Sequence, residues 1–124
     1  MALLNIRASY IHLSLFFSVM ALIGFSSAAY STPMSCPTQF HQLPLTPSAG
    51  FCQAFDQEFP VSLSYFSALN QEAVRAFYVQ ELGLPKSDSI TKGRYLLNYH
   101  DRQLTIVISA DGQGSQIDIL LKDK

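Results

Sequence analysis

The pattern that defines the architecture lies in residues 94–121, RYLLNYHDRQLTIVISADGQGSQIDILL. Apolar and polar side chains alternate in three parts of it, 94–99, 104–109 and 116–121. A period of two is typical of strands that bury one face. The links between these parts are polar and short, so consecutive strands must run antiparallel. We therefore predict a three-stranded antiparallel meander.

The preceding segment, NQEAVRAFYVQELGLP at residues 70–85, predicts an amphipathic helix over 71–82. Asn70 is suited to cap its start. Gly83 is suited to end it, and Pro85 prevents its continuation. Apolar residues recur at helical spacing and form one stripe, made of Val74, Phe77, Tyr78 and Leu82.

Residues 61–66, VSLSYF, also alternate and predict a strand ahead of the helix. The expected fold class is therefore α+β, in the order β-α-β-β-β. One amphipathic helix would pack on an antiparallel sheet of about four strands. Residues 60–124 would form this core domain.

Residues 30–59 are predicted to be an irregular N-terminal arm, because they are rich in proline, glycine, serine and threonine. Within it, Phe51, Phe55 and Phe59 recur every fourth residue. That spacing fits either a short helix or a loop whose aromatic side chains pack on the core.

Residues 1–29 resemble a secretory signal peptide. Arg7 provides a positive start, residues 13–25 form an uncharged apolar run, and Ser27-Ala28-Ala29 offers small residues for cleavage. We expect cleavage before Tyr30 and an exported, periplasmic or secreted protein. The alternative is an uncleaved membrane anchor, although polar residues interrupt the apolar run.

The chain has 2 cysteines, Cys36 and Cys52. An even count in an exported chain favours a disulfide, which would tie the arm to the core. Free thiols or a metal pair are the alternatives. The spacing is not that of a Cys-x-x-Cys redox pair, and His41 nearby does not complete a zinc ligand set.

Length and charge exclude several classes of protein. A chain of 124 residues is too short for a multi-domain enzyme. A formal net charge of −1 argues against nucleic acid as a partner. The sequence predicts no cofactor.

Three groups of polar residues are candidates for chemistry. His100 and Asp101 could form a general base for a small hydrolase or lyase, although a solvated turn also contains such residues. Asp56 and Glu58 could form a glycosidase pair, but a solvated edge is the simpler interpretation. Residues 111–122 lack the ligand spacing of a calcium-binding EF-hand loop. We therefore predict no catalytic or metal-binding residue.

Aromatic residues gather between Phe40 and Phe66. If the core leaves some of them uncovered, they would form a binding surface for a protein or a small apolar ligand. The alternative is that the arm buries them as a satellite core. The candidate surface consists of Phe51, Phe55, Phe59 and Tyr65.

The helix segment AFYVQELG at residues 76–83, followed by the strand pattern, resembles small exported bacterial proteins with an FYxxxLG helix and a strand meander. The resemblance covers about residues 60–121 and implies no activity. We expect a non-enzymatic binding or accessory protein of the bacterial cell envelope. A secreted inhibitor that docks through an edge strand is a further alternative.

Overall fold

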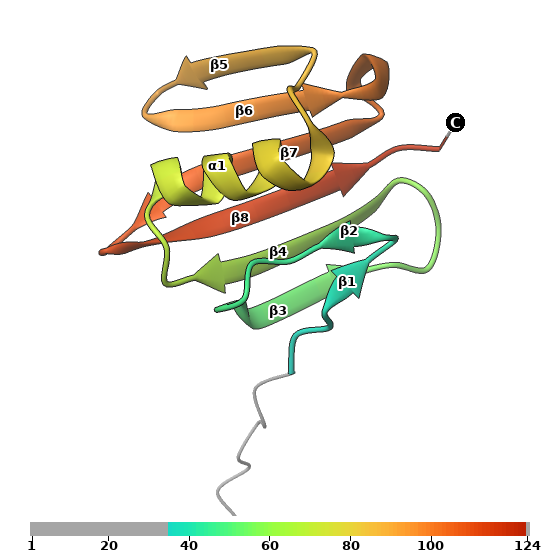
Figure 1. The fold of residues 1–124 in the computed structure, drawn as a ribbon. Coiled ribbons are helices and arrows are strands. Elements are labelled where there is room, and N and C mark those ends of the chain that lie inside the picture. Colours follow the sequence, from blue (N-terminus) through green and yellow to red (C-terminus); the bar gives the residue numbers. More distant parts are fainter. Residues whose placement is uncertain (1–34, 124) are drawn as a thin grey trace, which may run out of the picture. The chain divides into compact units, whose positions relative to one another are not determined.

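The computed structural model describes residues 35–123 (Figure 1). The predicted signal peptide and its cleavage site lie outside the described residues. Within the described part, no helix has the length and apolar character needed to span a bilayer. The elements are β1 (Gln39–Phe40), β2 (Leu43–Pro44), β3 (Gly50–Phe55), β4 (Val61–Ser67), α1 (Gln71–Leu82), β5 (Ser87–Thr91), β6 (Arg94–Tyr99), the 3-10 helix η1 (His100–Arg102), β7 (Leu104–Asp111) and β8 (Gly114–Leu121).

The predicted α+β class, with one helix on about four strands, is wrong. The described chain is mostly β, with one short α-helix and strands in two sheets of 2 and 6 strands. The arm that we expected to be irregular forms β1 and β2 as a separate hairpin, and β3 as a member of the main sheet. The segment between the helix and the meander, for which no strand was predicted, forms β5.

These strands escaped prediction because backbone pairing, rather than an alternating pattern, defines them. All five residues of β5 are exposed, so nothing selects for apolar side chains there. The strand forms because Lys92 and Gly93 make a two-residue turn with positive φ, which returns the chain as β6. In β3, a bulge between Gly50 and Gln53 interrupts the pairing with β4 and masks the period of two.

The main sheet is antiparallel, in the order β3-β4-β8-β7-β6-β5. The final strand, β8, lies between β4 and β7, and α1 links β4 to the far edge at β5 (Figure 1). The predicted helix and the strands at residues 61–66, 94–99, 104–109 and 116–121 are confirmed. Asn70 caps α1 by accepting a hydrogen bond from the Ala73 amide at 2.9 Å.

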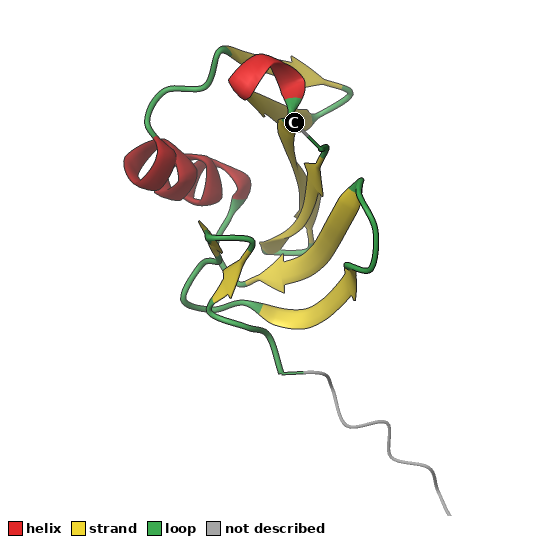
Figure 2. Cartoon of the chain, turned by 90° about the vertical axis from the view of Figure 1, so that its right-hand side faces the viewer, coloured by secondary structure: helices red, strands yellow, loops and turns green. Residues whose placement is uncertain are grey.

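The helix and the β1–β2 hairpin cover the same face of the six-stranded sheet, here called the inner face. Figure 2 shows the sheet curving around them. The hairpin buries Phe40 and Leu43, and α1 buries Val74 and Tyr78. They meet a layer of buried side chains from the central strands, among them Leu63, Leu97, Ile106, Ile108, Ile117 and Ile119. Within residues 35–123, no helix or hairpin covers the opposite, outer face.

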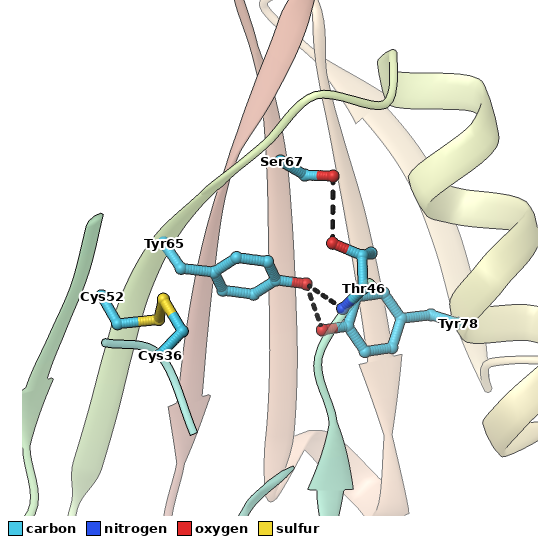
Figure 3. The surroundings of a disulfide bond; sticks show 6 residues. All are labelled: Cys36, Thr46, Cys52, Tyr65, Ser67 and Tyr78. Carbon is cyan, nitrogen blue, oxygen red and sulfur yellow. Dashed lines mark hydrogen bonds between the residues drawn. A yellow bond between two sulfur atoms is a disulfide. The ribbon is translucent and has the colours of Figure 1, made fainter. Parts of the chain in front are cut away.

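Two kinds of bond hold the N-terminal segment on this core (Figure 3). Cys36 and Cys52 form a disulfide, which confirms the predicted pairing. Beyond the hairpin, the Thr46 amide donates to the Tyr65 hydroxyl at 3.3 Å, and the Thr46 hydroxyl donates to Ser67 at 3.0 Å. The Tyr65 and Tyr78 hydroxyls lie 2.7 Å apart and hydrogen-bond to each other.

These buried hydroxyls connect three parts of the chain: the segment after the hairpin, β4 and α1. Each of these hydroxyls has at least one hydrogen-bond partner, and among the described residues no buried side-chain polar atom is left without one. Burial, and secondarily the neighbouring Tyr65, raise the pKa of the Tyr78 hydroxyl far above its ordinary value. Folding therefore favours the neutral form of Tyr78.

Candidate ligand cavity

The strands of the main sheet end in one row beneath the last turn of α1. Leu121 at the end of β8 pairs on one side with Val61 at the start of β4. On the other side it pairs with Leu104 at the start of β7. Leu104 also pairs with Tyr99 at the end of β6. The antiparallel register thus places four residues that are distant in the sequence side by side, with their side chains on the inner face: Val61, Leu121, Leu104 and Tyr99.

A cavity of about 580 Å³ lies over this row. This volume is within the range of roughly 300–1,000 Å³ that is usual for small-molecule sites. Tyr99, Leu104 and Leu121 provide its floor, Leu82 at the end of α1 provides one wall, and the tip of the β1–β2 hairpin provides another. We call it the end cavity; its lining is His41, Gln42, Leu43, Phe59, Leu82, Tyr99, His100, Gln103, Leu104, Leu121, Lys122 and Asp123.

Two hydrogen bonds to backbone carbonyls join the elements that form the floor. The Tyr99 hydroxyl donates to the Gly83 carbonyl at 3.0 Å, which joins the end of β6 to the end of α1. The Lys122 amide donates to the Gln103 carbonyl at 2.8 Å, which joins the end of β8 to the start of β7. The apolar floor is therefore built by rigid elements, and the rim carries the polar groups.

The hairpin tip is unusual in its backbone conformation. His41 and Gln42 form the two-residue turn between β1 and β2, with φ of 48° and 68°. Turns of this kind normally use Asn-Gly, because side chains such as histidine and glutamine cost about 1 kcal/mol or more at positive φ. The turn thereby presents the side chains of His41 and Gln42, both capable of hydrogen bonding, at the cavity rim.

His41 is held in place by neighbours on both sides. Its Nε2 atom hydrogen-bonds to the Asp56 carboxylate. Its ring lies 5.7 Å from the ring of Phe59 and 4.7 Å from that of Phe40, measured between centroids. Asp56 therefore pairs with a histidine, and it is not shown acting with Glu58 as a carboxylate pair.

The side chains of His100 and Asp101, although adjacent in the sequence, line different hollows of the surface. His100 lines the end cavity, whereas Asp101 lines a separate hollow with Lys86. The Asp101 carboxylate accepts a hydrogen bond from Lys86 Nζ, and this bond lowers the pKa of Asp101. Both residues have positive φ, of 51° and 53°. The carboxylate is thus engaged by a lysine and does not orient the imidazole.

The four residues of the predicted aromatic surface do not form one patch. Tyr65 is buried in the hydroxyl network, so it belongs to no exposed surface. Phe59 is half-exposed and lines the end cavity. Phe51 and Phe55 are exposed on β3 at 76% and 64% of their surface, and Phe51 packs against Phe66 on the outer face.

Asp118 on β8 has partners within the sheet. Asp118 accepts hydrogen bonds from Ser64 across β4 and from Gln116 on its own strand. Among the described residues, no group of three or more histidine, cysteine or acidic side chains is placed to hold a metal ion.

Sequence reasoning missed most of the cavity. The sequence indicates Phe59 as part of an aromatic surface and His100 as a candidate general base, and nothing in it connects the two residues. The sequence indicates His41 only as a candidate zinc ligand, Leu82 as part of the helix stripe and Leu121 as part of a strand, and it singles out Leu43 for no role. The cavity could have been predicted from the strand ends that lie side by side at its floor. That arrangement requires β4 to pair with β8, and the local sequence pattern does not specify this pairing.

The chain matches no family model, no curated protein and no solved structure.

Proposed function

We propose that this protein is a small, exported, non-enzymatic binding protein of the bacterial cell envelope, and that it holds a small, largely apolar molecule in the end cavity. The observation that carries the proposal is the composition of the cavity. An apolar floor and walls lie beneath a rim that carries His41, His100 and Lys122. Such a site buries an apolar body and orients a polar end.

Two features support export. Residues 1–29 have the composition of a secretory signal peptide. The Cys36–Cys52 disulfide is compatible with an oxidising compartment. Neither feature identifies the ligand, so the proposal commits to its physical class.

A binding role fits the geometry better than catalysis by His100. A histidine base needs a partner that holds its tautomer and orientation. The carboxylate next in sequence, Asp101, is bonded to Lys86. His100 is therefore assigned to ligand orientation.

The amphipathic fluorescent probe 1-anilinonaphthalene-8-sulfonate tests the proposal. Leu121 and Leu120 are adjacent on β8, and only Leu121 lines the cavity; Leu120 lies on the outer face. Tryptophan at position 121 fills the cavity, and tryptophan at position 120 is the matched control. The chain contains no other tryptophan, so each variant also reports its own environment.

We expect saturable one-to-one binding of the probe to the wild-type protein. Leu121→Trp should weaken it at least tenfold, by about 1.4 kcal/mol, and Leu120→Trp should leave it unchanged. Circular dichroism would establish that both variants are folded. Non-saturable binding to the wild type, or equal losses in the two variants, would contradict the proposal.

A further inference from the structure

We infer that the molecule held in the end cavity is an amphiphile with a carboxylate head group, bound by His100, Gln103 and Lys122. This inference rests on the proposed function, because it names the chemistry of the ligand's polar end at the same cavity. It is drawn from the way polar side chains are distributed around the rim.

The backbone joins three polar residues on one side of the rim. The Gln103 amide donates to the His100 carbonyl at 3.0 Å, and the Lys122 amide donates to the Gln103 carbonyl at 2.8 Å. These bonds hold the end of β8 beside η1, on the side where β6 also ends (Figure 1). All three residues line the cavity, and we call them the donor group.

The side chains of the donor group are available to a ligand. Among the described residues, none of the three has a hydrogen bond or an ion pair through its side chain. His41, across the rim, differs because its Nε2 atom already bonds to the Asp56 carboxylate. The polar side chains that can bind a head group therefore gather on the side of the donor group.

The donor group suits an anion with a single negative charge. Lys122 provides one ammonium, Gln103 donates through its amide, and the His100 ring donates from one nitrogen in either neutral tautomer. A carboxylate accepts several hydrogen bonds, and one ammonium matches its charge. A phosphate monoester carries about 1.5 to 2 negative charges near neutral pH, so one ammonium would leave part of its charge uncompensated.

The acidic residue of the lining, Asp123, sharpens this choice. It takes part in an interaction of its own within the protein, and it follows Lys122 directly in the chain. A second negative charge on the head group would be repelled by the Asp123 carboxylate, which again favours a monoanion. Because Asp123 also attracts cations, the test includes a cationic amphiphile.

The donor group adjoins the apolar floor of the cavity. Leu104 follows Gln103, Leu121 precedes Lys122, and both leucines belong to the floor. A head group bound by the donor group would therefore place its apolar body over these side chains. The positive φ of His100, 51°, supports a binding role, because strained backbone outside glycine is concentrated at ligand-binding sites.

Three compounds with the same alkyl body and different head groups test the inference: octanoate, 1-octanol and octylamine. Near neutral pH they are an anion, a neutral molecule and a cation. Isothermal titration calorimetry of the purified protein, with each compound below its micelle-forming concentration, measures the dissociation constants. We expect octanoate to bind about tenfold more tightly than 1-octanol, as a hydrogen bond to a charged group allows, and octylamine to bind most weakly.

Lys122→Gln removes the charge and keeps a hydrogen-bond donor. It should weaken octanoate binding about tenfold, to the level of 1-octanol, and leave 1-octanol unchanged. The matched control is Lys92→Gln, which removes the same charge from the turn between β5 and β6, outside the cavity lining. It should leave the binding of all three compounds unchanged. The affinity of each variant for 1-octanol reports the state of the cavity, so a folding defect is not mistaken for loss of the charge.

Octanoate that binds no more tightly than 1-octanol or octylamine would overturn the inference. Equal losses of octanoate affinity in the two lysine variants would overturn it as well. The end-cavity proposal is judged separately, by saturable binding of the fluorescent probe and its sensitivity to Leu121→Trp. Probe binding without a preference for octanoate would leave that proposal standing and refute this one, whereas absence of all binding would refute both.

Discussion

The ring of Phe66 on β4 packs directly against Gly114 at the start of β8. A Cβ atom built at Gly114 would lie 2.8 Å from Phe66 Cζ and 2.3 Å from the Ser67 carbonyl oxygen. Gly114 is therefore glycine because another strand and an aromatic ring occupy the space of its side chain. The contact lies where β8 begins beside the end of β4, and at the other end of the same strand pair Val61 is paired with Leu121, which contributes to the floor of the end cavity.

Gly114→Ala should destabilise the protein by about 1–3 kcal/mol, because backbone as well as the Phe66 ring must move. Urea unfolding monitored by circular dichroism measures the change. Gly50→Ala is the control, since a Cβ there meets nothing within 4 Å and the φ of Gly50 is not positive. A change within about 1 kcal/mol is expected for the control. Equal effects of the two substitutions would contradict this explanation of Gly114.

Removal of the disulfide should lower the free energy of unfolding by about 3 kcal/mol, since the bridge closes a loop of 16 residues and restricts the unfolded chain. The variant is Cys36→Ser with Cys52→Ser. Urea unfolding with and without dithiothreitol checks the prediction. The reductant should destabilise the wild type by the same amount as the double substitution and should not affect the variant. Undiminished stability in the double variant would refute it.

Tyr65→Phe should cost more stability than Tyr78→Phe, although both remove one hydroxyl from the same pair. Without the Tyr65 hydroxyl, both the Thr46 amide and the Tyr78 hydroxyl lose a partner. Without the Tyr78 hydroxyl, only Tyr65 loses one, and it retains the bond from Thr46. We expect about 1–3 kcal/mol for Tyr65→Phe and about 1 kcal/mol for Tyr78→Phe in denaturant unfolding. The reverse order would show that the Thr46 bond contributes little.

Stability should fall at high pH because the pKa of Tyr78 is raised in the folded protein. The contribution is fully present below the pKa of an unfolded tyrosine, about 10, and is lost as pH rises above it. Unfolding free energies between pH 8 and pH 11.5 should therefore decline more steeply for the wild type than for Tyr78→Phe. Parallel pH profiles would contradict the prediction.

Export should release a chain that begins at Tyr30. N-terminal sequencing of the protein recovered from the periplasm or medium checks this. Replacement of Ala29 by a bulky residue should prevent cleavage, because signal peptidase accepts small residues there. Recovery of a protein beginning at Met1 would favour the uncleaved anchor.

The local sequence pattern was sufficient to predict an element wherever the residues that define it are neighbours in the sequence. The helix over 71–82 has a cap, a stripe and a stop, all within 16 residues of sequence, and the structure has the same helix. The strands of the meander bury one face, so their alternation was visible. The Cys36–Cys52 pairing followed from having only 2 cysteines. These features depend on side chains that are neighbours in the sequence.

The remaining features depend on contacts between distant segments. β5 has no apolar pattern because it is an exposed outer strand, and β3 is masked by its bulge. The insertion of β8 between β4 and β7 is a choice among sheet orders that the same patterns allow. That choice aligns Val61, Leu121, Leu104 and Tyr99, and it brings His41 and His100 to one cavity. Local sequence thus determined where the chain forms a helix and its clearest strands, whereas long-range pairing decided which strands are neighbours and created the cavity.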